Sequence, residues 1–189
     1  MSSHHIVREK QEPALLILGL DGFDDEQLGQ LLEWSPTVMT TSPMAEQLHA
    51  FGIKIDWIVA NDADNDLQSD IKYLSINNKT PEIAVLDHLV NNGYSAVNII
   101  TDKFNLDQYL PYADKITIVV FYRQQKIYGI ESGFSKWKPA GDTIQILSIP
   151  KNLITQGLEQ TGENTYITVA DGFFSLYFDN SMLFITESL

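Results

Sequence analysis

Residues 57–67 read WIVANDADNDL and join an apolar strand to a run of carboxylates. The four apolar residues 57–60 lead directly into Asp62, Asp64 and Asp66, which stand at every second position. In an extended chain, these three side chains project to the same side. Because crowded carboxylates repel one another, such a cluster is stable either in solvent or around a cation, and oxygen ligands of this kind suit Mg²⁺ or Ca²⁺.

A second interpretation of the same residues needs no ligand. A polar loop can turn into a helix with Asn65 or Asp66 as its cap, and Leu67, Ile71 and Leu74 follow at a spacing that predicts such a helix. In open α/β sheets, ligands bind beyond the carboxyl ends of strands, which is where this loop is expected to lie. Both interpretations therefore remain open from the residues alone.

The chain on either side of this stretch alternates between strand and helix patterns. The predicted strands are Ala14–Leu20, Thr37–Thr41, Asp56–Ala60, Ala96–Ile100 and Lys115–Tyr122. The predicted helices are Asp25–Trp34, Pro43–Phe51, and one that begins at Thr80-Pro81-Glu82 and stops at Gly93. This alternation predicts a three-layer α/β domain with a mainly parallel sheet over residues 1–121.

The pattern changes in residues 122–189, where short apolar runs are separated by turn residues and no helical period occurs. The expected strands are residues 126–130, 143–149, 165–170, 173–178 and 182–186, with hairpin turns at Gln124-Gln125, Asp171-Gly172 and Asp179-Asn180. We therefore expect a second domain here, a small antiparallel β-sandwich. Trp137 lies in the stretch SKWKPAGD, which has the composition of a loop and suits a stacking role.

Composition limits the classes of partner. The 189 residues carry a formal net charge of -13, which argues against nucleic acid or an anionic membrane. The chain has no cysteine, so disulfides and thiolate ligands are excluded. The longest apolar run, Ala14–Leu18, is far too short to span a bilayer, and the polar N-terminus lacks a signal-peptide pattern. A cytoplasmic protein is expected.

Gly19-Leu20-Asp21-Gly22 follows a strand and precedes a helix, a position where a loop can hold a phosphate. Four acidic residues, at 21 and 24–26, crowd that helix start. A phosphate would be repelled there without a cation, so the sequence favours a plain turn.

Several motifs resemble those of the thiamine pyrophosphokinase family. That family carries Gly-Ile-Lys-Pro-Asp, an apolar strand and then Gly-Asp-Phe-Asp-Ser. This chain has Gly52-Ile53-Lys54-Ile55-Asp56, the strand WIVA, and Asn61-Asp62-Ala63-Asp64-Asn65. Lys79-Thr80 matches the start of the family's Lys-Thr-Asp motif, with Pro81 in place of the aspartate. The order of an α/β part followed by a β-rich part also fits the family.

Other motifs of the family are replaced. Thr41-Ser42-Pro43-Met44-Ala45-Glu46 stands where the family has Ala-Asp-Gly-Gly-Ala-Asn. Thr101-Asp102-Lys103-Phe104-Asn105 stands where the family has Gly-Gly-Arg-x-Asp-His, so its arginine is missing. Arginine holds phosphate with a fork of donors that lysine does not reproduce.

The resemblance implies an enzyme that transfers pyrophosphate from ATP to thiamine, giving thiamine diphosphate and AMP. It implies Mg²⁺ on Asp62 and Asp64, a catalytic Thr80, and phosphate contacts from Lys79 and Lys103. Trp137 is the candidate for binding thiamine. A homodimer is expected from the family. The alternative is a non-catalytic relative that keeps the fold and binds a small ligand or acts as a dimeric partner, which the replaced motifs favour.

Overall fold

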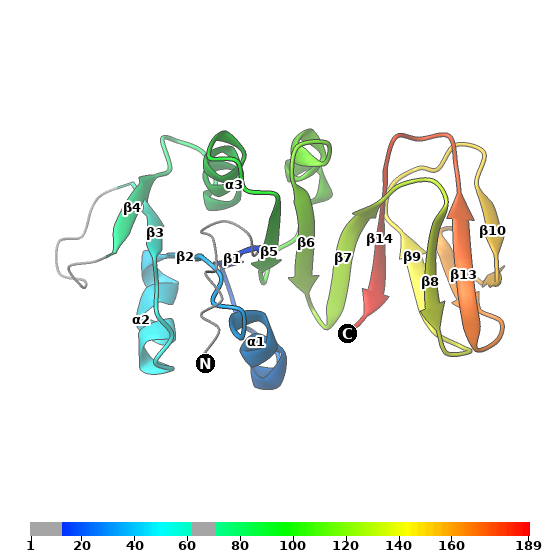
Figure 1. The fold of residues 1–189 in the computed structure, drawn as a ribbon, viewed down its shortest axis with the longest axis horizontal. Coiled ribbons are helices and arrows are strands. Elements are labelled where there is room, and N and C mark those ends of the chain that lie inside the picture. Colours follow the sequence, from blue (N-terminus) through cyan, green and yellow to red (C-terminus); the bar gives the residue numbers. More distant parts are fainter. Residues whose placement is uncertain (1–12, 62–70) are drawn as a thin grey trace, which may run out of the picture. The chain divides into compact units, whose positions relative to one another are not determined.

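A computed structural model describes residues 13–61 and 71–189. The chain forms two compact units, residues 1–118 and 119–189. The division expected from the sequence, after residue 121, falls inside strand β6, Thr117–Tyr122, which begins in the first unit and ends in the second. Figure 1 shows the order of the elements along the chain.

The first unit is built on a parallel sheet. Its strands are β1 (Ala14–Ile17), β2 (Val38–Thr41), β3 (Trp57–Ala60), β4 (Lys72–Ser75) and β5 (Ala96–Ile100). They pair in parallel in the order β5-β1-β2-β3-β4. All four residues of β1 are buried, which explains why this central strand reads as an uninterrupted apolar run.

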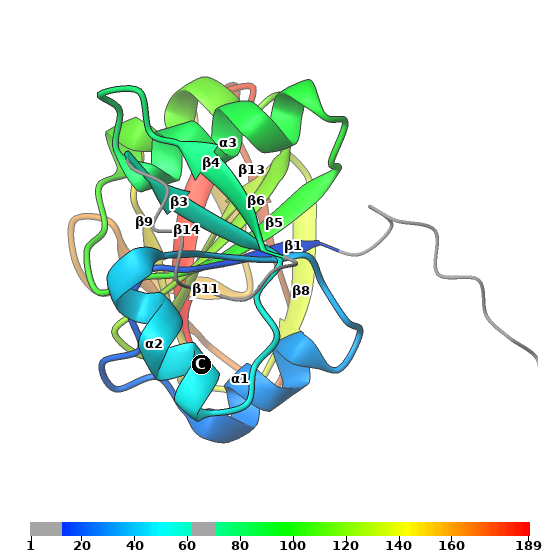
Figure 2. The same cartoon turned by 90° about the vertical axis from the view of Figure 1, so that its left-hand side faces the viewer.

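Helices cover both faces of this sheet. They are α1 (Asp25–Leu32), α2 (Ser42–Ala50) and α3 (Pro81–Asn91), with two short 3₁₀ segments, η1 (Leu106–Gln108) and η2 (Leu110–Tyr112). Figure 2 shows α3 on one face and α1 and α2 on the other. The predicted three-layer α/β architecture with a mainly parallel sheet is therefore confirmed.

Local sequence signals explain where the helices begin and end. The Asp24 carboxylate accepts hydrogen bonds from the amides of Glu26 and Gln27 at 2.9 and 3.2 Å, and so caps α1. Gly52 and Gly93, which follow α2 and α3, have φ of 71° and 73°, a conformation that favours glycine and ends a helix.

The helix expected from Leu67, Ile71 and Leu74 is wrong where the structure describes it. Leu67 lies outside the described residues, and residues 72–75 form strand β4, which pairs in parallel with β3. Both ends of β4 are exposed and its two middle residues are half-buried, as suits a short strand at the edge of the sheet. An edge strand needs little apolar patterning, and here pairing with β3 outweighs the helical spacing.

The second unit is an antiparallel β-sandwich. Its strands after β6 are β7 (Gln125–Ile130), β8 (Phe134–Lys138), β9 (Thr143–Ile146), β10 (Ile154–Gln156), β11 (Leu158–Gln160), β12 (Thr165–Thr168), β13 (Gly172–Tyr177) and β14 (Leu183–Ser188). One sheet has the order β6-β7-β14-β9-β12-β11, and the other has the order β10-β13-β8. Buried residues of both sheets, including Ile144, Phe174, Leu176 and Ile185, form one core.

The predicted hairpin turns need correction. The first turn is Arg123-Gln124, one residue earlier than expected, because Tyr122 pairs with Gln125. The other two positions, Asp171-Gly172 and Asp179-Asn180, do not close hairpins, because β12 and β14 lie in one sheet and β13 in the other. Among residues 13–61 and 71–189, no helix is long and apolar enough to cross a membrane.

Candidate functional site

The carboxyl ends of β1, β2, β3 and β5 lie along one edge of the sheet, since these strands run in parallel. From β1 to β4, each strand is added on the same side of the one before it, whereas β5 lies on the opposite side of β1. The direction in which strands are added across the sheet therefore reverses between β1 and β5. Open α/β sheets bind their ligands at such a reversal, outside the carboxyl ends of the strands. We take this edge as the candidate site.

Asp102, just after β5, joins the two loops at this reversal. Its Oδ1 accepts a hydrogen bond of 3.0 Å from the amide of Asp21. A Cβ atom placed on Gly19 would lie 1.8 Å from Asp102 Oδ2, so any larger residue there would displace the Asp102 side chain. The Asp21 amide is occupied by a carboxylate of the chain, which agrees with the plain turn expected from the sequence.

Lys103 is the basic residue that the β5 loop presents at this edge. The amide of Lys103 donates to Thr101 Oγ1 at 3.2 Å, and the Thr101 hydroxyl donates to the Lys103 carbonyl at 2.9 Å. Thr101 is buried and Lys103 is exposed. The two hydrogen bonds fix the backbone of this turn and leave the lysine side chain in solvent.

Thr80 stands at the start of α3, as predicted from its capping pattern. Its Oγ1 accepts a hydrogen bond of 3.4 Å from the amide of Ile83. Pro81 follows at the first position of the helix, where its fixed φ is favourable and no amide is needed. The structure therefore places Thr80 where the chain enters α3.

Lys79 is held along the side of α3. Its Nζ lies 2.6 Å from Asp87 Oδ2, and the Tyr112 hydroxyl donates to Asp87 Oδ1 at 2.7 Å. The hydrogen bonds from Lys79 and Tyr112 lower the pKa of Asp87. Partial burial and the bond to Asp87 raise the pKa of Tyr112 to about 12. Asp87 lies about 9 Å along the helix from its first residue, so the pair draws the ammonium of Lys79 toward the middle of α3.

A cavity of about 240 Å³ lies next to this pair. Ser75, Lys79, Asp87 and His88 are among the residues that line it. Because Lys79 and Asp87 neutralise each other at its wall, the cavity offers a small ligand polar groups without a net charge.

The carboxylates Asp62, Asp64 and Asp66 lie outside the described residues. Strand β3 ends at Ala60 on the candidate edge, and Asn61 is the last residue described before them. Within the described part of the chain, no group of three His, Asp or Glu side chains is placed to hold a metal ion. A magnesium site at this edge would therefore depend on the run of aspartates, whose oxygens are of the kind that Mg²⁺ prefers.

Trp137 lies in strand β8 of the second unit, so the expected loop is wrong. It faces outward from its sheet, opposite Phe173 of β13, and these side chains are 54% and 72% exposed. The alternating burial along β8 explains the strand: Phe134, Lys136 and Lys138 are half-buried and the residues between them are exposed. That alternation is masked in the sequence, because two of the inward positions are lysines.

Two residues of the edge, Gly19 and Asp102, were not predicted as partners. Each follows a predicted buried strand, which was the available signal. Their contact depends on β5 lying next to β1, and the sequence does not show that strand order. The chain has only two arginines, Arg8 and Arg123. Arg8 is outside the described residues, and Arg123 lies in the β6–β7 turn with its guanidinium 5.0 Å from the Tyr122 ring centre.

Comparison with solved structures shows that this fold recurs in other proteins. An α/β unit followed by a β-sandwich recurs in thiamin pyrophosphokinase from Geobacillus thermodenitrificans, with 13% identity, a TM-score of 0.65, and coverage of 93% of this chain and 97% of that chain. The enzyme from Candida albicans matches with 13% identity and a TM-score of 0.64, over 94% of this chain and 89% of that one. A protein from Lactobacillus plantarum matches with 12% identity and a TM-score of 0.68, over 94% and 98%.

The chain therefore has the thiamine pyrophosphokinase fold over nearly its whole length. Neither a family model nor the sequence of a curated protein matches it. At 10–15% identity, the shared property is the fold.

Proposed function

We propose that the protein transfers the pyrophosphoryl group of ATP to thiamine, giving thiamine diphosphate and AMP. The observation that carries this proposal is a shared fold that extends through both units. In the parallel sheet, the order of strands reverses between β1 and β5, and the aspartate run begins at the same carboxyl edge. We place the reaction in the cytoplasm, because its donor is ATP.

The proposed chemistry depends on positioning and on neutralising charge. Asp62 and Asp64, which follow β3, would hold Mg²⁺, and the bound ion would offset charge that develops on the transferred phosphates. Lys103 at the end of β5 would contact a phosphate as a point charge. Thr80 would approach the phosphates from the start of α3, and Trp137 would stack on the thiamine ring.

Lys79 already donates to Asp87 at 2.6 Å, so its charge is partly neutralised and a phosphate would share the ammonium with that carboxylate. With no arginine in the loops after β1, β3 and β5, we expect slow transfer. The same pairing favours a second candidate function, in which the protein binds nucleotide or thiamine without turnover.

The test is to incubate the purified protein with ATP, Mg²⁺ and thiamine and to quantify AMP and thiamine diphosphate. We expect the two products in equal amounts, and loss of both in the double variant Asp62→Asn, Asp64→Asn. Asp66→Asn is the matched control, because it removes one charge from the same run and should keep activity.

Binding separates the two candidates if no product forms. A ligand that binds the native state raises the melting temperature. A shift with Mg²⁺-ATP or thiamine, without turnover, would replace the catalytic proposal with the binding function. If the protein forms neither product and its melting temperature shifts with neither ligand, both candidate functions are wrong.

We also propose a homodimer that forms through the outer face of the β8-β13-β10 sheet. Four large apolar side chains are exposed on this face: Trp137, Phe173, Tyr177 and Ile154. They form two cross-strand pairs, Trp137 with Phe173 and Ile154 with Tyr177, on either side of Ser175, and large apolar side chains gathered on one exposed face favour an interaction site.

A further inference from the structure

A second cavity lies at the opposite edge of the parallel sheet from the candidate site. Its volume is about 350 Å³, within the range of small-molecule sites. Leu32, Val38, Ile53, Lys54 and Asp56 are among the residues that line it. Val38 is the first residue of β2 and Asp56 directly precedes β3, so the cavity lies at the amino ends of these strands.

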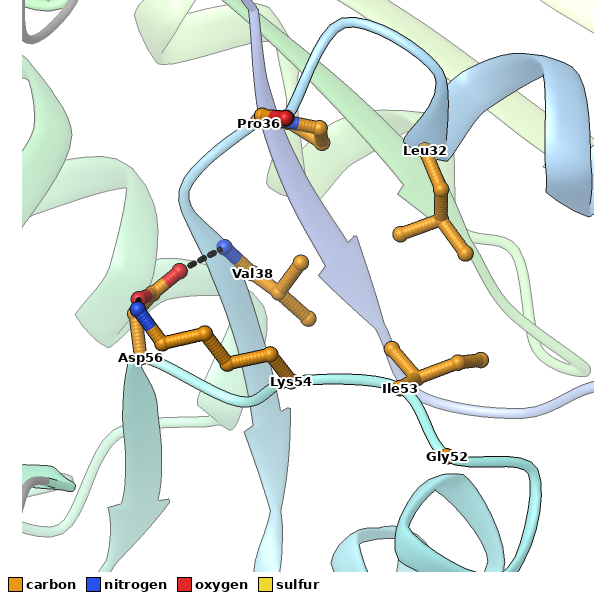
Figure 3. A pocket seen from close by; sticks show the side chains of 8 residues that line it. Leu32, Pro36, Val38, Gly52, Ile53, Lys54 and Asp56 are labelled. Carbon is orange, nitrogen blue, oxygen red and sulfur yellow. Dashed lines mark hydrogen bonds and ion pairs between the residues drawn. The ribbon is translucent and has the colours of Figure 1, made fainter.

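The body of the cavity is apolar. Leu32 comes from the end of α1, Val38 from β2, and Ile53 from the segment between α2 and β3. Figure 3 shows these three side chains pointing into the same space. A hydrocarbon ring placed against these side chains would lose contact with water where it touches them, and this burial favours binding.

One carboxylate stands at the side of the cavity in a fixed position. Asp56 Oδ2 accepts a hydrogen bond of 2.9 Å from the amide of Val38 (Figure 3). The Asp56 amide in turn donates to the Val38 carbonyl at 3.0 Å. These two bonds anchor Asp56 against β2, so its second oxygen needs no rearrangement to accept a ligand.

That second oxygen has a weak partner. Asp56 Oδ1 lies 3.4 Å from Lys54 Nζ, and these side chains are 31% and 83% exposed. An ion pair that is so exposed contributes little, because water screens it and the lysine loses rotamer freedom. A cationic group of a ligand can therefore take the place of Lys54 at small cost.

We propose that this cavity binds a small primary amine that carries an apolar ring. The ammonium group would sit on Asp56 Oδ1, and the ring would lie against Leu32, Val38 and Ile53. The net charge of -13 favours a cation over an anion at any such site. This site lies apart from the carboxyl edge and does not depend on the proposed pyrophosphoryl transfer.

Benzylamine is a suitable probe, with benzyl alcohol and benzoate as controls of the same ring size. Each is titrated into ¹⁵N-labelled protein at one pH and ionic strength. We expect benzylamine to shift the amide signals of Val38, Ile53 and Lys54, benzyl alcohol to bind more weakly, and benzoate to leave them unchanged. Equal or tighter binding of benzoate, or no shift of these amides with millimolar benzylamine, would overturn the proposal.

Two substitutions should change the affinity for benzylamine in opposite directions. Lys54→Ala removes the competing ammonium and should tighten benzylamine binding about two- to fivefold. Lys151→Ala, which removes an exposed lysine of the second unit, is the control for net charge. Asp56→Asn should weaken benzylamine about tenfold, since the amide can still accept from Val38 but carries no charge.

A folding defect in Asp56→Asn does not leave the question open, because Lys54→Ala tests the same contact independently. Weaker benzylamine binding in Lys54→Ala would show that the lysine is part of the site, and the assignment of an amine would be wrong. Ile53→Trp fills the cavity from a half-buried position and should abolish the shifts of Val38. Unchanged shifts in that variant would place the ligand elsewhere.

Discussion

At the scale of single residues, the most heavily compensated charge described is the carboxylate of Glu187, which is 4% exposed between the two sheets of the second unit. Its Oε1 pairs with Lys136, and its Oε2 lies 3.0 Å from the Nζ of Lys138. The Tyr128 hydroxyl donates to Oε1 at 3.3 Å. Burial alone would raise the pKa of Glu187, but the two lysines outweigh burial and lower it.

This direction fixes how stability depends on pH. Because the pKa of Glu187 is lower in the folded chain, the carboxylate stabilises the fold above its ordinary pKa, and that contribution is lost as the pH falls through the folded value. Glu187→Gln removes the carboxylate that Lys136 and Lys138 share, leaves Lys138 paired with Asp142, and should cost about 2 kcal/mol or more of unfolding free energy at pH 7. Urea unfolding at pH 7, 5 and 3 measures this difference.

The same unfolding measurements at three pH values include a control. The difference between the native chain and Glu187→Gln should shrink at pH 3, whereas Glu163→Gln, at an exposed position, should change little at any pH. A Glu187→Gln effect that stays constant from pH 7 to pH 3 would contradict the lowered pKa.

Sequence reasoning at this scale found residues whose role depends on their neighbours in the chain. Thr80 was predicted at the start of its helix because a cap and its helix are contiguous. The partner of Lys79 is eight positions away on α3, and Asp102 meets residues 81 positions earlier, so these contacts need the tertiary fold. Asp62 and Asp64 lie outside the described residues, and their role stays a prediction.

At the scale of elements, the β6–β7 hairpin has a turn whose residues do not suit it. Arg123 and Gln124 both have positive φ, 48° and 62°. Two-residue turns of this type favour Asn-Gly, because glycine and asparagine adopt positive φ with less strain. The sequence contains no such signal, which explains why the turn was placed one residue late.

Replacing Arg123-Gln124 by Asn-Gly should therefore stabilise the protein by about 1 kcal/mol, since the strain of two positive φ angles is relieved. Thermal unfolding followed by circular dichroism detects the gain as a higher melting temperature. Arg123→Lys is the control, because it keeps the charge and gains no turn preference. An unchanged or lower melting temperature in the Asn-Gly variant would show that the native side chains contribute more than the strain they cause.

Other elements show why sequence patterns identify some strands and miss others. β1 and β5 are central strands with apolar runs, and both were predicted within a few residues. β4 is an edge strand, and β8 turns two lysines inward toward Glu187, so neither has an apolar pattern. The inward-facing lysines of β8 thus conceal this strand from any argument based on hydrophobicity.

At the scale of the whole molecule, charge is unevenly divided. Residues 1–121 hold 18 acidic and 7 basic side chains, whereas residues 122–189 hold 7 and 5. Two copies that meet through the less charged second unit would repel each other less. The exposed face that carries Trp137 and Phe173 lies in that unit.

Size-exclusion chromatography with light scattering should therefore give twice the mass of one chain, 42.6 kDa for a 21.3 kDa protomer. Phe173→Asp replaces the most exposed of the four apolar side chains of the proposed interface by a charge and should shift the protein to the monomer mass. Phe51→Asp, which changes an exposed phenylalanine of the first unit, should leave the dimer intact. A monomeric native chain, or a dimer that persists in Phe173→Asp, would contradict the proposed interface.

The central claim is that the chemistry lies at the carboxyl edge of the parallel sheet, and paramagnetic relaxation tests it most directly. Mn²⁺ takes the place of Mg²⁺ with ATP bound, and it broadens amide signals steeply with proximity. We predict broadening at Asn61, Thr80 and Thr101, sharp signals at Val38 and Lys54 at the opposite edge, and loss of the broadening in Asp62→Asn, Asp64→Asn. Broadening centred on Val38 and Lys54, or broadening that the double variant leaves unchanged, would contradict the account.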